Sequence, residues 1–161
     1  MITRTALAPE NVQDYPRPPA LEQVDLPVRI VLGGTDIAMT DRVLRVCETH
    51  HAPTYYLPPE AFVPGALTPA PGTSFCEWKG TARYWSLSGG GVLRRRAAWS
   101  YSDPTEPFLP LRHQIAVYPG LMEACFIAGT RVTPQPGDFY GGWVTPNLSG
   151  TVKGAAGTAW W

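Results

Sequence analysis

The chain has little charge, no long apolar run and no sustained helical pattern. Charged residues make up 16% of its 161 residues, and 13 basic residues balance 13 acidic ones. This balance removes the excess positive charge on which non-specific nucleic-acid binding depends, and the single basic run, Arg94-Arg95-Arg96, is too short to replace it. No stretch approaches the roughly 18 apolar residues that a membrane-spanning helix needs. We therefore expect neither a nucleic-acid partner nor a membrane.

Cysteine is also scarce. Cys47, Cys76 and Cys125 are far apart, and none belongs to the C-x-x-C pair typical of a zinc site or a redox centre. The first ten residues, MITRTALAPE, lack the apolar segment of a secretory signal. These features predict a cytoplasmic protein with reduced thiols, no bound metal and no cofactor.

Turn-forming residues, in contrast, are abundant. The chain contains 18 prolines and 16 glycines, and they separate short runs of β-branched and aromatic residues. This pattern predicts a mainly β protein with little helix, apart from one helical turn in the PPEAF stretch. Strands are predicted at 28–32, 35–40, 43–49, 54–58, 76–87, 92–101, 113–119 and 122–129, with further short strands at 131–134 and 139–145.

The two ends of the chain differ from its middle. Residues 1–26 carry several prolines and no alternation, so we expect an extended N-terminal arm before a β domain at 27–145. Residues 146–161 form a tail rich in Gly and Ala that ends in Trp160-Trp161. Tryptophan side chains seldom stay fully exposed to solvent, so we expect these two to pack against this chain or against a partner. One such partner is a second copy of the chain, bound through the terminal segments to form a homo-oligomer.

Four segments of the predicted β domain resemble the signature segments of one family, the domain-of-unknown-function family numbered 427. They are THHAPTYYLPPE, CEWKGTARYWS, AAWSYSDP and FYGGWV, and the resemblance covers about residues 27–145. It implies a β-tent, in which antiparallel sheets lean together over a shared cavity, as in methionine sulfoxide reductase B and the thalidomide-binding domain of cereblon. Many β-tents hold zinc with two C-x-x-C pairs, which this chain lacks. The family has no established activity, so the resemblance implies a fold and leaves the chemistry open.

The stretch CETHHAPTYYLPP, residues 47–59, concentrates polar side chains before a strand. One interpretation is structural: Thr49 and one histidine bond to the backbone at the bend before Pro53. The other is functional: Glu48 orients a histidine that acts as an acid, base or anchor near neutral pH. Neighbouring histidines of an extended chain point to opposite faces, so one of the pair faces a cavity, and we favour His51. The same geometry disfavours a shared metal ion.

The segment CEWKGTARYW, residues 76–85, is interpreted as a strand with Trp78 on its core face and Lys79 on the other. Lys79 either lies in an exposed salt-bridged row or reaches into the tent to hold a carboxylate or enolate. A hairpin centred between residues 89 and 90 places Lys79 opposite residue 100. This register predicts one patch that contains Lys79, Trp99 and Tyr101, with His51 beside it.

Aromatic residues dominate the remaining candidates. Asp103 precedes a proline, so turn formation explains it as well as catalysis does. The abundance of phenol and indole groups in a small domain favours an aromatic pocket with a few polar groups. We predict His51, Glu48, Lys79 and Tyr101 as catalytic, and Tyr55, Trp78, Trp99, Asp103, Tyr140 and Trp143 as ligand-binding.

Three classes of function fit these residues. The first is a metal-independent acid–base enzyme, such as an isomerase, cyclase or hydrolase, acting on a small molecule. The second is a non-catalytic module that binds a small ligand in an aromatic cage. The third is an interaction scaffold that uses its terminal segments. We favour the small-molecule enzyme over the binding module by a small margin.

Overall fold

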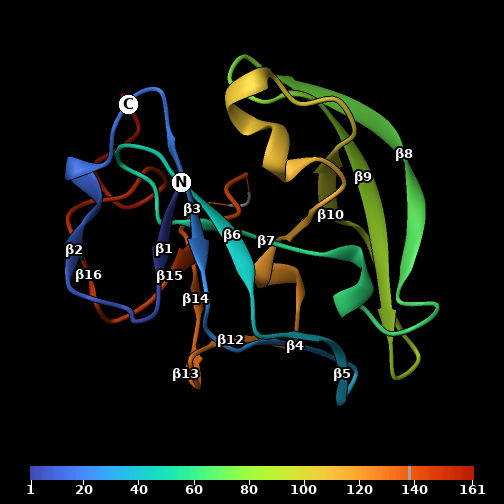
Figure 1. The fold of residues 1–161 in the computed structure, drawn as a ribbon. Coiled ribbons are helices and arrows are strands. Elements are labelled where there is room, and N and C mark those ends of the chain that lie inside the picture. The colour runs from blue at the N-terminus through green and yellow to red at the C-terminus, as the bar shows by residue number, and fades with distance from the viewer. Residues whose placement is uncertain (138) are drawn as a thin grey trace.

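Two β-sheets lean together in the computed structural model, which describes residues 1–137 and 139–161. Figure 1 shows the smaller sheet at the bottom of the molecule and the strands of the larger sheet rising from it. The larger sheet has the order β1 (Ile2–Arg4), β3 (Ala20–Val24), β6 (Val43–Cys47), β7 (Thr54–Leu57), β11 (Ile115–Val117), β10 (Val92–Tyr101), β9 (Gly80–Gly89) and β8 (Leu67–Cys76). The smaller sheet has the order β13 (Thr130–Arg131), β12 (Ala124–Ile127), β4 (Val28–Leu32) and β5 (Thr35–Thr40).

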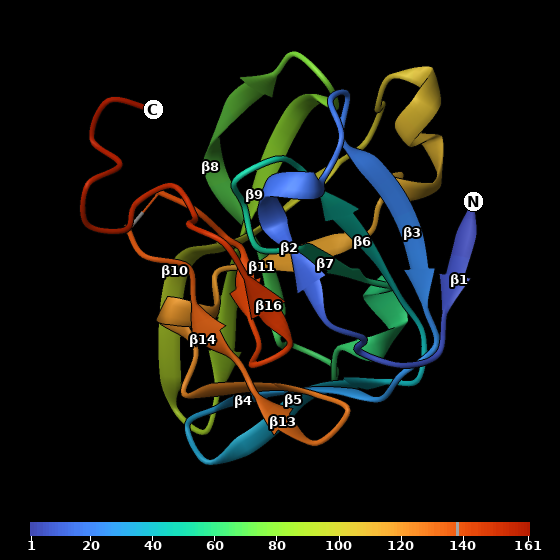
Figure 2. The same ribbon diagram turned by 90° about the vertical axis from the view of Figure 1, so that its left-hand side faces the viewer.

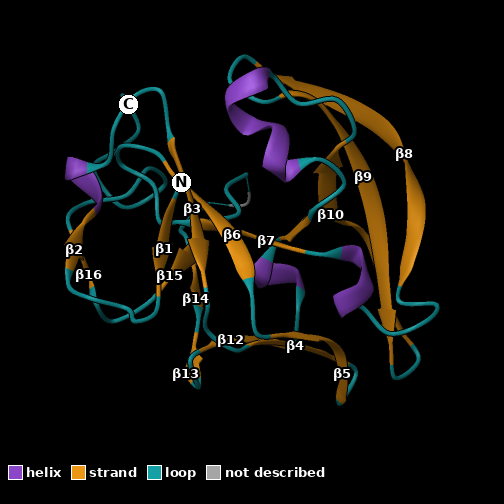
Figure 3. Ribbon diagram, viewed as in Figure 1, coloured by secondary structure: helices purple, strands orange, loops and turns teal. Residues whose placement is uncertain are grey.

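Shorter elements complete the described part of the chain. Two further strand pairs join β14 (Thr133–Pro134) to β15 (Trp143–Val144), and β16 (Leu148–Ser149) to β2 (Glu10–Asn11). The helices are short 3-10 turns, η1 (Val12–Asp14), η2 (Pro59–Ala61), η3 (Glu106–Leu111) and η4 (Pro119–Leu121), drawn in purple in Figure 3. The predicted mainly β fold with little helix is therefore confirmed. Across residues 1–137 and 139–161, no helix has the length and apolar character needed to cross a membrane.

The alternation of side chains along the strands builds two apolar clusters, one on each face of the larger sheet. The first cluster fills the space between the sheets, where Leu57 and Ile115 meet Ile30 and Ile127 of the smaller sheet. The second cluster covers the opposite face and is closed by η3. It comprises Val46, Tyr56, Ala82, Trp99, Tyr101, Phe108, Leu111 and Ala116. Strands of the larger sheet are thus apolar on both faces, and this accounts for their near-continuous hydrophobic runs.

The tips of two hairpins hold the sheets together. The β4–β5 turn at Gly33-Gly34 touches the β9–β10 turn at Gly90-Gly91, and all four glycines have positive φ. A Cβ on Gly33 or Gly90 would overlap the backbone of the facing turn. Glycine is therefore required here both for the tight turns and for the close approach of the two backbones.

The β9–β10 hairpin forms as predicted, but its register differs from the prediction. Strand β10 shifts register between Arg94 and Ala98, and Ser100 then pairs with Arg83 instead of lying opposite Lys79. Residues 77–79 form the turn between β8 and β9, so the strand that we predicted at 76–87 begins at Gly80. The extra residues of the β10 bulge and the short β8–β9 turn explain the error.

Strand β8 was missed by the sequence analysis. It lies at the free edge of the larger sheet and contains Pro69 and Pro71. Proline lacks the N–H that a central strand needs, and it is tolerated at an edge. The prolines therefore identify an edge strand, although on sequence alone they argue against a strand.

Residues 1–26, for which we expect an arm, contribute three strands. Strand β3 pairs antiparallel with β6, and β1 pairs parallel with β3. Figure 2 shows β1 and β3 on one side of the molecule and the C-terminal segment on the other. In the tail, Leu148 and Ser149 pair with β2, and the Trp161 ring lies 4.3 Å from that of His50, while Trp160 is exposed.

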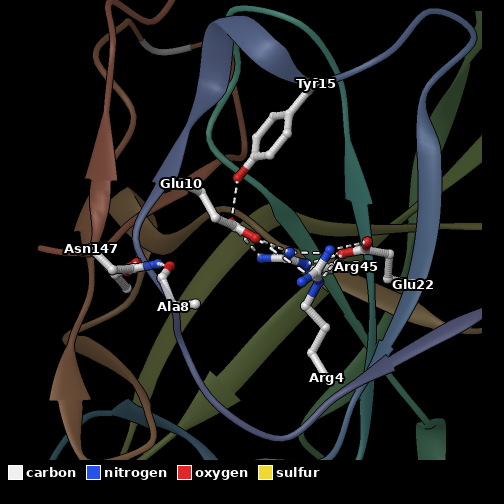
Figure 4. Close-up of polar contacts among 8 residues, drawn as sticks. Arg4, Ala8, Glu10, Tyr15, Glu22, Arg45 and Asn147 are labelled. Carbon is white, nitrogen blue, oxygen red and sulfur yellow. Dashed lines mark hydrogen bonds and ion pairs between the residues drawn. The ribbon is translucent and has the colours of Figure 1, made fainter.

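A partly buried ionic network connects Arg45 of β6 to β1, β2 and β3 (Figure 4). Arg45 is 2% exposed, and its guanidinium lies 2.6 Å from Glu10 Oε1 and 2.7 Å from Glu22 Oε1. Arg4 binds the same Glu22, and the Tyr15 hydroxyl donates to Glu10 over 2.7 Å. Burial alone would raise the pKa of both carboxyl groups, but the hydrogen bonds hold each pKa below its usual value. Both carboxylates are paired, so the network is structural.

Candidate functional site

A cavity of about 650 Å³ opens beside the second apolar cluster. One side is built by β9, β10 and the segment after β11, and the other by the segment that follows β14. Its lining comprises Tyr84, Arg96, Tyr118, Gly120, Leu121, Pro134, Gln135, Pro136, Gly137, Phe139 and Tyr140. Volume and composition fall within the usual range for small-molecule sites.

The wall on the sheet side is made of stacked aromatic rings. Tyr84 and Tyr118 line the cavity, and the Trp99 ring lies behind them with its centroid 4.5 Å from that of Tyr118. The chain at Gly141 crosses the Trp99 ring so closely that a Cβ there would overlap it. This contact brings the segment after β14 against the sheet. Trp99 therefore supports the aromatic wall instead of lining it.

Gln135 holds the opposite wall through three hydrogen bonds. Its Oε1 accepts from the backbone N–H of Ala52 over 3.0 Å, which identifies the other side-chain atom as the amide nitrogen. That nitrogen donates to the Lys153 carbonyl over 3.0 Å and lies 3.1 Å from His51 Nδ1. Gln135 is 2% exposed, so the cavity wall, the bend after β6 and the C-terminal tail meet at one buried amide.

These bonds determine the state of His51. The Gln135 amide nitrogen can only donate, so His51 Nδ1 accepts, and the neutral ring carries its proton on Nε2. His51 Nε2 lies 3.6 Å from Glu48 Oε2, and the ring packs edge-on to Tyr140 at 5.2 Å. Burial lowers the pKa of His51, and the charges of Lys153 and Lys79 add to this effect while Glu48 opposes it.

The predicted catalytic residues form two groups that lie outside the cavity lining. Glu48 and His51 lie behind the Gln135 and Tyr140 wall. Lys79 Nζ lies 5.7 Å from the centre of the Tyr101 ring, and Tyr101 is buried in the second cluster. Burial raises the pKa of the Tyr101 hydroxyl.

The predicted ligand-binding residues are spread over the molecule. Tyr140 lines the cavity, and Trp99 supports its wall. Tyr55 and Trp143 lie in the core between the sheets, with ring centroids 5.1 Å apart and exposures of 1% and 0%. Trp78 is half-buried in the β8–β9 turn, and Asp103 is exposed.

Of the lining residues only Tyr140 was predicted as a site residue, so the sequence missed, among others, Tyr84, Arg96, Tyr118 and Gln135. Tyr118 precedes a Pro-Gly pair at the end of a predicted strand. Arg96 belongs to the basic run that we judged too short to support nucleic-acid binding. Nothing in the sequence distinguishes Gln135 from other polar loop residues.

The three cysteines differ in exposure. Cys47 and Cys125 are buried, and burial raises the pKa of each thiol to about 12. Cys76 is partly exposed at the end of β8. Within residues 1–137 and 139–161, no group of three or more His, Cys, Asp or Glu side chains has an arrangement suited to a metal ion.

Two leaning sheets define a mainly β protein, as the sequence predicts. A family model described as "Domain of unknown function (DUF427)" matches residues 20–128. The chain therefore belongs to this family, as its signature segments indicate. The match begins with β3 and includes β12, so it covers both sheets except β1 and β13. A search of curated proteins yields no match to the chain.

Proposed function

We propose that this protein binds a small planar molecule in the cavity between β9–β11 and the segment after β14. The observation that carries the proposal is the lining itself, in which the phenol rings of Tyr84, Tyr118 and Tyr140 border a volume of about 650 Å³. Aromatic faces pack well against planar ligands and supply apolar area together with hydroxyl groups.

Binding is favoured over acid–base catalysis by the position of the titratable groups. His51 lies behind the wall, and its Nδ1 is engaged by Gln135. A general base must lie within hydrogen-bond reach of the proton that it removes. We therefore assign Glu48 and His51 to positioning of the wall, and the enzyme that we favoured from the sequence becomes the second candidate function.

The second candidate rests on the Lys79–Tyr101 contact. A lysine beside a buried phenol can stabilise negative charge that develops on a substrate. This function requires a substrate to reach the second cluster. A Lys79→Met variant that still binds the ligand but no longer converts it would support the catalytic function.

The proposal is tested with 2-naphthamide, a neutral planar probe, by isothermal titration calorimetry. The probe has about 13 non-hydrogen atoms, and about 0.3 kcal/mol for each gives about −4 kcal/mol, or a Kd of about 1 mM or tighter. Tyr84→Ala and Tyr140→Ala should each weaken binding several-fold. Phe75→Ala is the matched control, because it removes a ring that is 77% exposed and lies outside the cavity. Equal binding by all three variants and the native protein would contradict the proposal, as would the absence of binding to the native protein.

A further inference from the structure

We propose that the ligand of this cavity carries a negative charge, and that Arg96 is the residue that selects it. The inference rests on the proposed function and adds the chemical class of the ligand, a planar molecule with an anionic group such as a carboxylate. Its basis is the bulge in β10, which turns Arg96 out of the regular strand and toward the cavity.

The backbone of Arg96 is the first observation. Its φ is 50°, in a region that side chains other than glycine seldom adopt, and it lies where β10 shifts register between Arg94 and Ala98. Bulges of this kind redirect a side chain, and they are frequent beside functional sites. A regular strand would place residue 96 in the ladder opposite β9.

The position of the guanidinium is the second observation. Its central carbon lies 4.2 Å from the centre of the Tyr84 ring. Its nitrogen atoms also approach Gly72 of β8, where a Cβ would lie 3.5 Å from Nη2. Arg96 thus extends across β9, and the stacking on Tyr84 restrains a side chain that would otherwise be mobile.

The charges at the cavity are the third observation. Among the described lining residues, Arg96 alone is charged. Within residues 1–137 and 139–161, no carboxylate forms a salt bridge with it; Asp138 lies outside this described part. A stacked guanidinium presents its remaining N–H donors in a planar fork, which matches a carboxylate. An anionic group beside Arg96 would leave the rest of a planar ligand between the phenol rings.

The experiment compares three probes of nearly one shape: 2-naphthoate, 2-naphthamide and 2-naphthylmethylamine, which are anionic, neutral and cationic at pH 7.5. The native protein should bind 2-naphthoate about fivefold more tightly than 2-naphthamide, and the amine most weakly. Arg96→Gln should abolish the preference for 2-naphthoate while retaining the binding of 2-naphthamide. Arg96→Lys keeps the charge without the fork and should retain part of the preference.

Arg95→Gln is the matched control. It removes the same charge from the neighbouring residue, which does not line the cavity. If Arg95→Gln reduces the preference as much as Arg96→Gln does, the selection comes from the general charge of the strand, and the inference is overturned. Equal affinity of the native protein for the anionic and neutral probes also overturns it and leaves the proposed function intact. Failure of all three probes to bind rejects the proposed function itself.

Discussion

The hydrogen bond between Gln135 and His51 predicts that the protein loses stability when His51 is protonated. Neutral His51 accepts at Nδ1 from an amide that is already bound to Ala52 and to the carbonyl of Lys153. A proton on Nδ1 would face the amide hydrogens. The Gln135 side chain would then either turn away and lose its hydrogen bonds to Ala52 and Lys153, or stay in place with its amide N–H facing the His51 Nδ1–H.

The sign of the pH dependence follows from the lowered pKa of His51. Burial, Lys153 and Lys79 lower the folded-state pKa below the value of about 6.5 for an unfolded chain. The stabilisation is fully present above about pH 6.5, and it is lost as the pH falls from there through the folded pKa, because the unfolded state binds the proton more readily. The lost bond is worth about 1 kcal/mol, which sets the size of the effect.

The assay is urea unfolding between pH 7.5 and pH 5.0, above the range in which Glu10 and Glu22 titrate. The free energy of unfolding of the native protein should fall by about 1 kcal/mol over this interval. His51→Asn keeps an acceptor near Nδ1 and does not titrate, so it should remove most of the fall. His113→Asn, which replaces an exposed histidine, should keep it. An equal fall in all three proteins would refute the assignment of His51 as a neutral acceptor.

Three further predictions concern stability and reactivity. Arg45→Met leaves the buried Glu22 and the partly buried Glu10 short of their shared partner, so it should cost about 3 kcal/mol in urea unfolding. A loss below about 1 kcal/mol would contradict the network. Gly33→Ala should destabilise the protein by at least about 1 kcal/mol more than Gly34→Ala. Both glycines have positive φ, but only Gly33 lies against the backbone of the facing turn. Equal melting temperatures of the two variants would count against that contact. An aromatic disulfide reagent at pH 8 should modify Cys76 in the native protein and should react with Cys47 and Cys125 only after unfolding. Fast reaction of all three thiols in the native protein would disprove the burial of Cys47 and Cys125.

The strands were predictable because local features define them. Runs such as 28–32 and 54–57 combine β-branched or aromatic residues with flanking turn residues, and the glycine pairs mark the hairpin tips. The β8 edge strand was not predictable, since Pro69 and Pro71 weigh against any strand whose place in the sheet is unknown.

The site was harder to predict because it depends on contacts between distant segments. Gln135 meets His51 across 84 residues, and Arg45 meets Glu10 across 35, without a periodic pattern to signal either. The sequence predicted one patch of Lys79, Trp99 and Tyr101 with His51 beside it; in the structure His51 contacts Gln135 and Tyr140, and Lys79 lies over the Tyr101 ring. The sequence did not indicate the bulge that turns Arg96 toward the cavity, because positive φ at a non-glycine residue has no reliable signal in sequence.

The most direct test of the central claim is a crystal structure of the protein soaked with 2-naphthoate. We expect density for the naphthalene ring among Tyr84, Tyr118 and Tyr140, with the carboxylate directed at Arg96. Suppose that calorimetry shows binding but the density for 2-naphthoate lies only at other surfaces and this cavity is empty. That result would contradict the proposed binding site.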